Sequence, residues 1–451
     1  MGSHSSADCR PHAPGVDPLT AADVPTVASG PVAEERVRVL QRLGVLCGVA
    51  AGAWLGAAEV PAKLVSSGLS PVLVSLVMVL GVFLGRWTLP AMARGTSQTR
   101  SDFLQAPHLV IWAILAGCLW AVANTLTIFA IRDLGLSIAF PLWNTNAIIG
   151  IAWGVLFFGE LKNAGWVRWT AVSGGAVLMF CGGLILARVS ASHASSQAAT
   201  QGIAAALGAG VLWGTMYIPY RKAYLSGMNP LSFVSFFTIG ELGMMAVLSA
   251  HYIGGVMTLW QQLKEARHLL FWLLAAGFVW VIGDIFQQYA VKYIGVSRGI
   301  PLSNSNQLWG LLWGALAFGE LKGWGHSAVA SAIYGSILMA GGLAAISCSI
   351  AGPSEHEQWR QAAARERKRY GLDAQFVNSG LEGKSAVPAQ ARSWFDWFLV
   401  AAATAAFVWT GMAARWPSRD LNWATAVALS GIGLALFAAT VICLWRATRF
   451  N

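Results

Sequence analysis

The stretch that decides the fold is FPLWNTNAIIGIAWGVLFFGELK, residues 140–162. It is apolar enough to lie within a lipid bilayer, yet it carries Asn144 and Asn146 shortly after Pro141. Residues 300–322 repeat the pattern as IPLSNSNQLWGLLWGALAFGELK. A pair of amides placed twice inside an oily segment indicates an internal duplication.

The composition is that of an integral membrane protein. Of 451 residues, 56% are hydrophobic and only 11% are charged, whereas about a quarter of a soluble domain is charged. A helix needs ~20 consecutive apolar residues to cross a bilayer. The apolar runs predict ten transmembrane helices between residues 43 and 350, with the amide pairs inside the runs 136–159 and 297–319. Two further runs lie at 395–413 and 423–445.

The two copies align without gaps when residues 112–165 are compared with 272–325. Besides Gly-Glu-Leu-Lys, the alignment pairs Asn144 with Asn304 and Asn146 with Asn306. A weaker match pairs other positions, namely Gly52 with Gly210 and Pro61 with Pro219. Because five helices are an odd number, two successive units enter the membrane from opposite sides, an arrangement common in secondary transporters. We therefore expect an all-α integral membrane protein with ten transmembrane helices in two inverted five-helix repeats.

The chain divides into five predicted parts. They are a disordered arm at 1–38, the first repeat at 39–190, the second repeat at 200–350, a charged cytoplasmic linker at 351–393 and a transmembrane hairpin at 394–446. The arm is rich in Pro, Ser, Ala and Gly, a composition that cannot bury a core. The role of the hairpin is open between a homodimer contact and regulation.

The net charge of +10 reflects membrane topology rather than nucleic-acid binding. Most of the 30 Lys and Arg, Arg86 among them, fall on segments assigned to one side of the membrane when the N-terminus is placed in the cytoplasm. The positive-inside rule then predicts that both termini are cytoplasmic. We expect a multi-pass protein of the plasma (inner) membrane with the lipid bilayer, and no nucleic acid, as a partner.

The asparagines have two interpretations. Residues i and i+2 of a helix point about 200° apart, so Asn144 and Asn146 cannot both face one pathway. The same holds for Asn304 and Asn306. One interpretation is hydrogen bonding between helices. The other is binding of a polar, uncharged ligand, for which Asn144 and Asn304 are the first candidates and Asn146 and Asn306 the next.

Three carboxylates lie inside predicted helices, Glu59, Glu241 and Asp284. Ionisable groups in a bilayer are costly and usually functional, so we expect these three to take part in proton coupling. A structural role as hydrogen-bonded acids is the alternative. Glu160 and Glu320, in the Gly-Glu-Leu-Lys runs, are expected at helix ends with their charges reaching the membrane interface.

The aromatic residues suggest the substrate class. An indole offers a flat apolar face and one N–H donor, which suits the C–H face and hydroxyl rim of a sugar. The further substrate-binding candidates are Trp54, Trp120, Trp213, Trp280, Tyr217 and Gln287. Packing alone is the alternative for the tryptophans. The six cysteines show no CxxC or metal-ligand spacing, and no HExxH motif occurs. We expect no metal, no cofactor and no enzymatic activity.

A family resemblance rests on AGCLWAVANTLTIFAIRDLGLSIAFPLWNTNAIIGIAWGVLFFGE (116–160) and AGFVWVIGDIFQQYAVKYIGVSRGIPLSNSNQLWGLLWGALAFGE (276–320). Each segment has a small residue, Gly and Trp, then Gly-[Leu/Val]-Ser, then a helix ending in Gly-Glu. The chain resembles the drug/metabolite transporter superfamily and, within it, the glucose/ribose porter family. The resemblance implies uptake of a monosaccharide by proton symport, and no binding residue is carried over from it. Export of another metabolite or drug, and a non-transporting sensor, remain alternatives.

Overall fold

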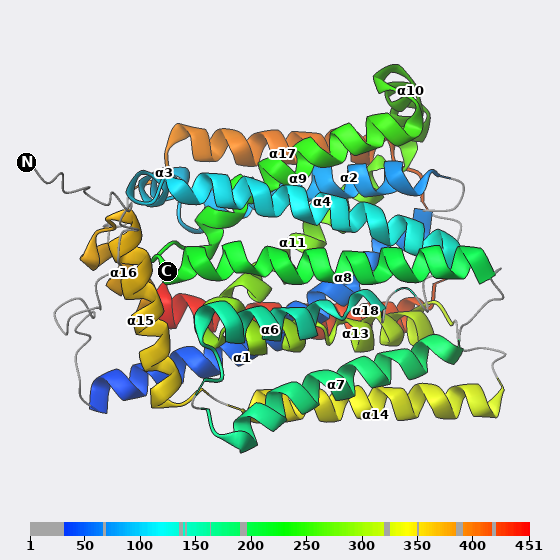
Figure 1. Ribbon diagram of the computed structural model, residues 1–451. Coiled ribbons are helices and arrows are strands. Elements are labelled where there is room, and N and C mark those ends of the chain that lie inside the picture. Colours follow the sequence, from blue (N-terminus) through cyan, green and yellow to red (C-terminus); the bar gives the residue numbers. More distant parts are fainter. Residues whose placement is uncertain are drawn as a thin grey trace, which may run out of the picture.

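The computed structural model describes residues 31–65, 69–134, 139, 142–162, 164–189, 196–319, 325–349, 351–384, 391–416 and 421–451. Throughout these ranges the regular structure is helical and no strand occurs (Figure 1). The arm predicted at 1–38 lies outside the described residues as far as residue 30. From residue 31 onward the chain is helical, as the start of α1, rather than disordered. The expected all-α class is therefore confirmed for the described part of the chain.

Ten of the described helices are long and apolar enough to cross a membrane. They are α1 (Pro31–Val65), α2 (Pro71–Ala93), α4 (His108–Leu134), α7 (Trp166–Val189), α8 (Ser196–Leu225), α9 (Pro230–Ile253), α11 (Leu270–Ile294), α14 (His326–Cys348), α17 (Trp394–Ala413) and α18 (Trp423–Thr448). The chain is thus an integral membrane protein. The shorter helices are α3 (Thr96–Gln105), α10 (Val256–Glu265), the 3₁₀-helix η1 (Ala266–His268), α15 (Pro353–Tyr370) and α16 (Ala374–Leu381).

The two runs that carry the amides are not continuous helices. The first includes α6 (Asn146–Phe158), and the second is divided into α12 (Val296–Ser303), α13 (Asn306–Leu312) and the π-helix η2 (Trp313–Ala317). At both breaks the backbone forms tight i to i−3 hydrogen bonds, such as Thr145 N to Leu142 O and Ser305 N to Leu302 O. The Thr145 hydroxyl also donates to the Leu142 carbonyl, a side-chain competition that interrupts helices.

Each break is crossed closely by a helix of the other predicted repeat. A Cβ atom added at Gly52 of α1 would lie 1.9 Å from the hydroxyl of Ser305. A Cβ atom added at Gly210 of α8 would lie 2.3 Å from the hydroxyl of Thr145. Only glycine fits such approaches, which let helix backbones pack in a membrane. The repeat arrangement stays a prediction, and these matched contacts support it.

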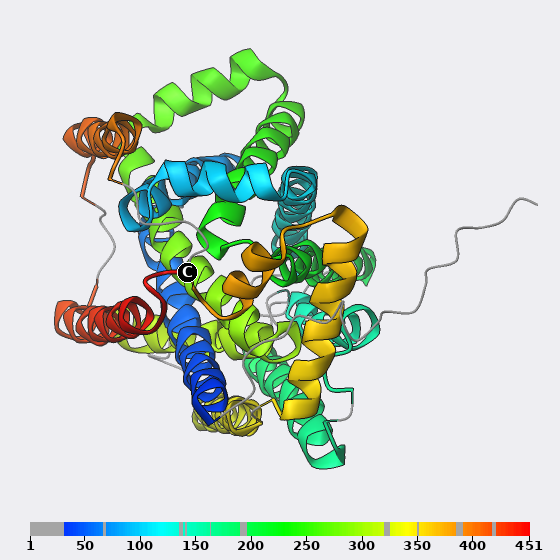
Figure 2. The same ribbon diagram turned by 90° about the vertical axis from the view of Figure 1, so that its left-hand side faces the viewer.

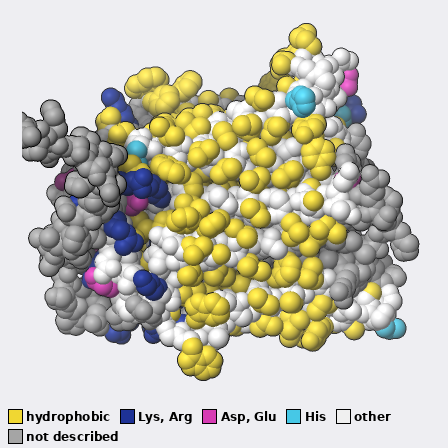
Figure 3. Space-filling model, viewed as in Figure 1, with side chains coloured by type: hydrophobic (Ala, Val, Ile, Leu, Met, Phe, Trp, Pro, Cys, Tyr) yellow, Lys and Arg dark blue, Asp and Glu magenta, His cyan; other side chains and the backbone are white. Residues whose placement is uncertain are grey.

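The ends of the bundle differ in character. In Figure 3 most of the visible Lys and Arg gather at the end where α15 lies, and hydrophobic side chains cover the middle. Figure 2 shows α15 crossing this end of the bundle, with α17 and α18 at its edge. At the opposite end, α10 connects α9 to α11 through η1.

Candidate functional site

The amides predicted as substrate-binding residues meet between the two helix breaks. Asn304 Nδ2 donates to Asn146 Oδ1 at 3.0 Å, and both side chains are buried. This bond joins non-equivalent positions of the two copies. In the alignment of the two copies, Asn144 is equivalent to Asn304, and Asn306 is equivalent to Asn146. Asn144 keeps an unpaired Nδ2 and Asn306 an unpaired Oδ1 among the described residues, so the counterpart of the observed bond is not formed.

Two further candidates lie around the breaks. Gln287 of α11 donates to the hydroxyl of Ser303 at 2.6 Å, directly beside Asn304. Tyr217 of α8 is buried, and its ring lies 3.6 Å from a Cβ atom added at Gly150 of α6. Both residues are therefore next to a helix that carries an amide.

Three of the four candidate tryptophans form one cluster. The ring of Trp120 lies 5.6 Å from that of Trp280 and 6.5 Å from that of Trp213. Trp213 also has a buried Nε1 with no hydrogen-bond partner among the described residues. Trp54 contacts Phe437 of α18 instead, with 5.6 Å between ring centroids. No ring contact joins Trp54 to the cluster in the described residues.

Glu241 and Asp284, two of the predicted proton-coupling residues, bind one buried arginine. Arg86 of α2 donates to Glu241 of α9 and, through Nη2 at 2.8 Å, to Asp284 of α11. All three side chains are at most 1% exposed. The assignment of Arg86 to the charges flanking the membrane is wrong, because Arg86 lies inside a membrane-spanning helix and pairs with carboxylates of two others.

The net charge of this triad depends on the protonation of its two carboxylates. Two ionised carboxylates and one guanidinium sum to a single negative charge, and a single proton would neutralise it. Asp284 also accepts from Gln288 at 2.9 Å, whereas Glu241 Oε1 has no partner among the described residues. Asp284 and Gln287 are three residues apart on α11, so they lie on neighbouring positions of one face. The ring of Trp280 lies 5.2 Å from Cζ of Arg86, so the triad contacts the tryptophan cluster.

The structure leaves Glu59 undecided and corrects the prediction for Glu160. Glu59 belongs to α1, but its side chain lies outside the described residues, as does Glu320. Glu160 lies directly after the end of α6, as expected, but its side chain is fully buried and does not reach solvent. It pairs with Arg221 at 2.9 Å and accepts from the backbone N–H of Ser297 at 2.8 Å. A carboxylate is favourable at this helix N-terminus, and only the tertiary fold brings the two together.

The residues around Ser297, GVSRG at 295–299, match the Gly-x-Ser-x-Gly spacing of serine hydrolases. That motif acts on a sharp turn from a strand into a helix. Here Gly295 joins the two helices α11 and α12, and the carboxylate beside Ser297 binds its backbone N–H. The match in spacing therefore lacks the structural context of a nucleophile.

The predicted linker is docked on one end of the bundle. Glu355 of α15 is fully buried and pairs with Arg298 of α12 at 2.9 Å. Trp359 lies under the guanidinium of Arg221, 4.5 Å from ring centroid to Cζ. Further along, the ring of Tyr370 stacks on that of His108 at 3.7 Å. These contacts close the end of the bundle near the start of α12.

Comparison with known proteins gives the family. A family model described as "Sugar transport protein" matches residues 69–189 and 205–365, more than half of the chain. The chain is 32% identical over 95 residues to a "Putative sugar uptake protein" of Streptococcus pyogenes serotype M1. It is 32% identical over 85 residues to another of Streptococcus agalactiae serotype V. The matches span 21% and 19% of this chain and only 32% and 28% of those relatives.

A solved structure described as "Crystal structure of protein" superimposes with a TM-score of 0.47 at 16% identity, covering 67% of this chain and 95% of that chain. Similarity at that level supports no statement about the present chain. The family assignment rests on the long family-model match, which includes both amide-bearing breaks and the Arg86 triad. On that match, this multi-pass membrane protein belongs to the sugar transport protein family.

Proposed function

We propose that this protein imports a neutral, glucose-like monosaccharide by proton symport. One observation carries the proposal: a buried, uncharged amide and indole region lies beside a charged triad with one excess negative charge. The amide and indole region suits binding of a sugar, and the charged triad suits binding of a proton. The names of the relatives, putative sugar uptake proteins, favour import as the direction of net transport.

The substrate is assigned to the amides and the indoles. Because the helices break at residues 144–145 and 304–305, the helical geometry that would point the two asparagines of each copy apart does not apply. Asn144, Asn304, Asn146 and Asn306 then supply donors and acceptors, and the cluster of Trp120, Trp213 and Trp280 supplies apolar faces. Arg86, the guanidinium of the triad, is already engaged by two carboxylates. Such a region suits hydroxyl groups better than a phosphate, which needs free cations.

Proton coupling is assigned to Glu241 and Asp284, with Glu59 as a further candidate. Charges within a bilayer are costly unless paired, so the doubly ionised triad is disfavoured when the pathway closes around it. Taking up one proton makes the triad neutral. The contact between Arg86 and Trp280 would then let the protonation state of the triad influence the tryptophan cluster.

Alternating access follows from the amide pairs. If the two repeats are inverted copies, a state facing the other side would form the counterpart bond, from Asn144 to Asn306, and break the bond from Asn304 to Asn146. The unpaired atoms of Asn144 and Asn306 are the donor and acceptor which that exchange requires. Two states built from equivalent bonds would have similar free energies, which a carrier needs.

The orientation is assigned from charge. The basic end covered by α15 (Figure 3) would face the cytoplasm of a cell whose plasma membrane holds the protein. Both termini would then be cytoplasmic. The chain would then consist of an N-terminal arm, two repeats, a cytoplasmic linker and a transmembrane hairpin.

The test is uptake of a labelled monosaccharide panel, glucose included, in cells that lack their own sugar carriers. Accumulation of one sugar that collapses with a protonophore would support symport. Uptake that equilibrates and is indifferent to the protonophore would refute coupling but retain sugar transport. No uptake, together with binding of a sugar to the purified protein, would point to a sensor, and sugar efflux from loaded cells would point to an exporter.

A further inference from the structure

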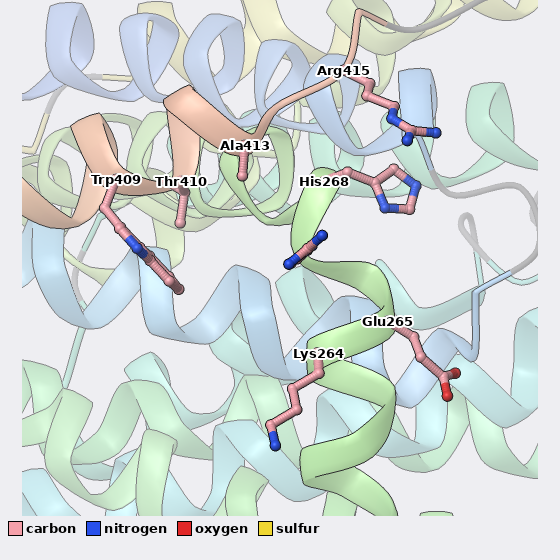
Figure 4. Close-up of a pocket in the computed structure, with 8 residues that line it drawn as sticks. Lys264, Glu265, His268, Trp409, Thr410, Ala413 and Arg415 are labelled. Atoms are coloured by element: carbon pink, nitrogen blue, oxygen red, sulfur yellow. The ribbon is translucent and has the colours of Figure 1, made fainter.

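A pocket of about 650 Å³ is lined by none of the residues assigned to transport. It is formed between α10 with η1 on one side and the last turn of α17 on the other (Figure 4). Its charged lining consists of Lys264, Arg267, Arg415 and one acid, Glu265, together with His268. Positive charge therefore dominates the pocket.

The cations of this pocket are available to a ligand. Among the described residues, neither Lys264 nor Arg267 nor Arg415 has an ion-pair partner. Glu265 accepts a hydrogen bond from Gln261 at 3.1 Å and points away from Trp409 in Figure 4. One acid against three cations leaves the lining of the pocket with a net positive charge.

The backbone that carries the cations is held in place. The N–H of Arg415 donates to the carbonyl of His268 at 3.1 Å, and the indole of Trp272 donates to the carbonyl of Arg415 at 3.0 Å. These bonds tie the end of α17 to η1 and the start of α11. The pocket is therefore a built feature of the junction between the bundle and the hairpin.

The pocket lies at the level of lipid headgroups. Trp409 and Trp416 are 68% and 77% exposed at this end of the hairpin, and exposed tryptophans mark the membrane–water interface. Figures 1 and 2 show α10 lying across the axes of the bundle helices, and Met257 and Trp260 on it are exposed. A short helix with exposed apolar residues in this orientation is typical of one that lies in the interface plane.

We propose that this pocket binds the headgroup of an anionic phospholipid, with the phosphate held by Lys264, Arg267 and Arg415. Arg and Lys are the usual partners of phosphate. The exposed apolar residues Val408 and Met412 on α17 offer a surface for the acyl chains. A lipid is favoured over a free anion because the pocket joins a basic rim to an apolar, membrane-facing helix. The bound lipid would fasten the hairpin to the bundle.

The test uses the full chain, delipidated in an uncharged detergent. Retained lipid is counted by native mass spectrometry, and thermal unfolding is followed with phosphatidylglycerol, phosphatidylcholine or inorganic phosphate added. The variant combines Lys264→Gln, Arg267→Gln and Arg415→Gln. The matched control combines Lys264→Arg, Arg267→Lys and Arg415→Lys, which keeps all three charges at the same sites.

The natural chain and the control should bind phosphatidylglycerol and gain thermal stability from it. The neutralised variant should bind roughly 100-fold more weakly, since each cation near an anionic headgroup contributes about a fivefold effect. Its melting temperature without lipid should change little, because the replaced side chains have no ion pairs among the described residues and the lost contact is that of Lys264 with the exposed ring of Trp260, at 5.4 Å. Equal binding by the neutralised variant, equal binding of phosphatidylcholine, or the same stabilisation by inorganic phosphate alone would overturn the proposal.

Discussion

Replacing Glu241 by Gln should separate sugar movement from proton movement. In the natural protein, Arg86 shares its guanidinium between Glu241 and Asp284, which leaves one uncompensated negative charge. The Glu241→Gln variant would hold a neutral Arg86–Asp284 pair, and the new amide oxygen can still accept from Arg86. We therefore expect the variant to fold and to bind sugar without needing a proton.

The size of the expected change in sugar accumulation follows from the one proton charge that moves with each sugar. One elementary charge crossing a membrane potential of 100 mV is worth about 2.3 kcal/mol, and about 1.4 kcal/mol is a factor of ten in an equilibrium constant. A carrier that moves one proton with each sugar can thus accumulate the sugar roughly 50-fold at that potential. For Glu241→Gln the accumulation ratio should fall to about 1, which is plain equilibration.

The assay is uptake into proteoliposomes under a potassium diffusion potential of about 100 mV, a drive that supplies a known free energy. Counterflow of labelled against unlabelled sugar is the control, because exchange requires no net proton movement. Counterflow should persist in Glu241→Gln. Accumulation by this variant equal to that of the natural protein would refute the assignment of the excess charge to the triad. A second control, Arg86→Met, should lose about 3–5 kcal/mol of stability, because it leaves two buried carboxylates without their cation.

Asn144→Ala and Asn304→Ala should each lower uptake about tenfold with membrane insertion intact, since a lost or unpaired amide costs about 1–3 kcal/mol. Only Asn304→Ala should also lower the melting temperature, because Asn144 has an unpaired amide here; full uptake in both would leave these amides as structural. Glu355→Gln should weaken the docking of α15 by leaving Arg298 buried without its ion pair, and hydrogen exchange over α15 would then rise; unchanged exchange would contradict this. Burial lowers the pKa of His356 in α15, so its neutral form favours docking. Docking should be fully stable above about pH 6.5, the value for an exposed histidine, and weaken as pH falls below it. Protection factors over α15, corrected for the intrinsic pH dependence of amide exchange, that stay constant between about pH 5 and 8, where only histidine normally titrates, would refute this.

Much of the fold could be predicted from local sequence. Hydrophobic runs of sufficient length identify membrane-spanning helices, because a bilayer imposes a fixed thickness on each one. The sequence also identified the paired amides and the rare carboxylates Glu241 and Asp284, since polar groups stand out in an apolar segment. It did not predict that the amide-bearing helices break at Asn144 and Asn304, because an apolar run with a helical length looks continuous.

The partners of the buried charges were decided only by tertiary structure. Arg86 meets Glu241 across 155 residues and Asp284 across 198 residues of chain, and no local pattern relates positions so distant. Counted by sequence, Arg86 and Glu160 resemble charges at the membrane surface. In the folded chain each is buried beside an opposite charge. The sequence by itself determined which groups must avoid lipid, because the free-energy cost of placing a polar group in lipid depends on the residue and on the segment that carries it. Which groups pair with one another depends on how the helices pack.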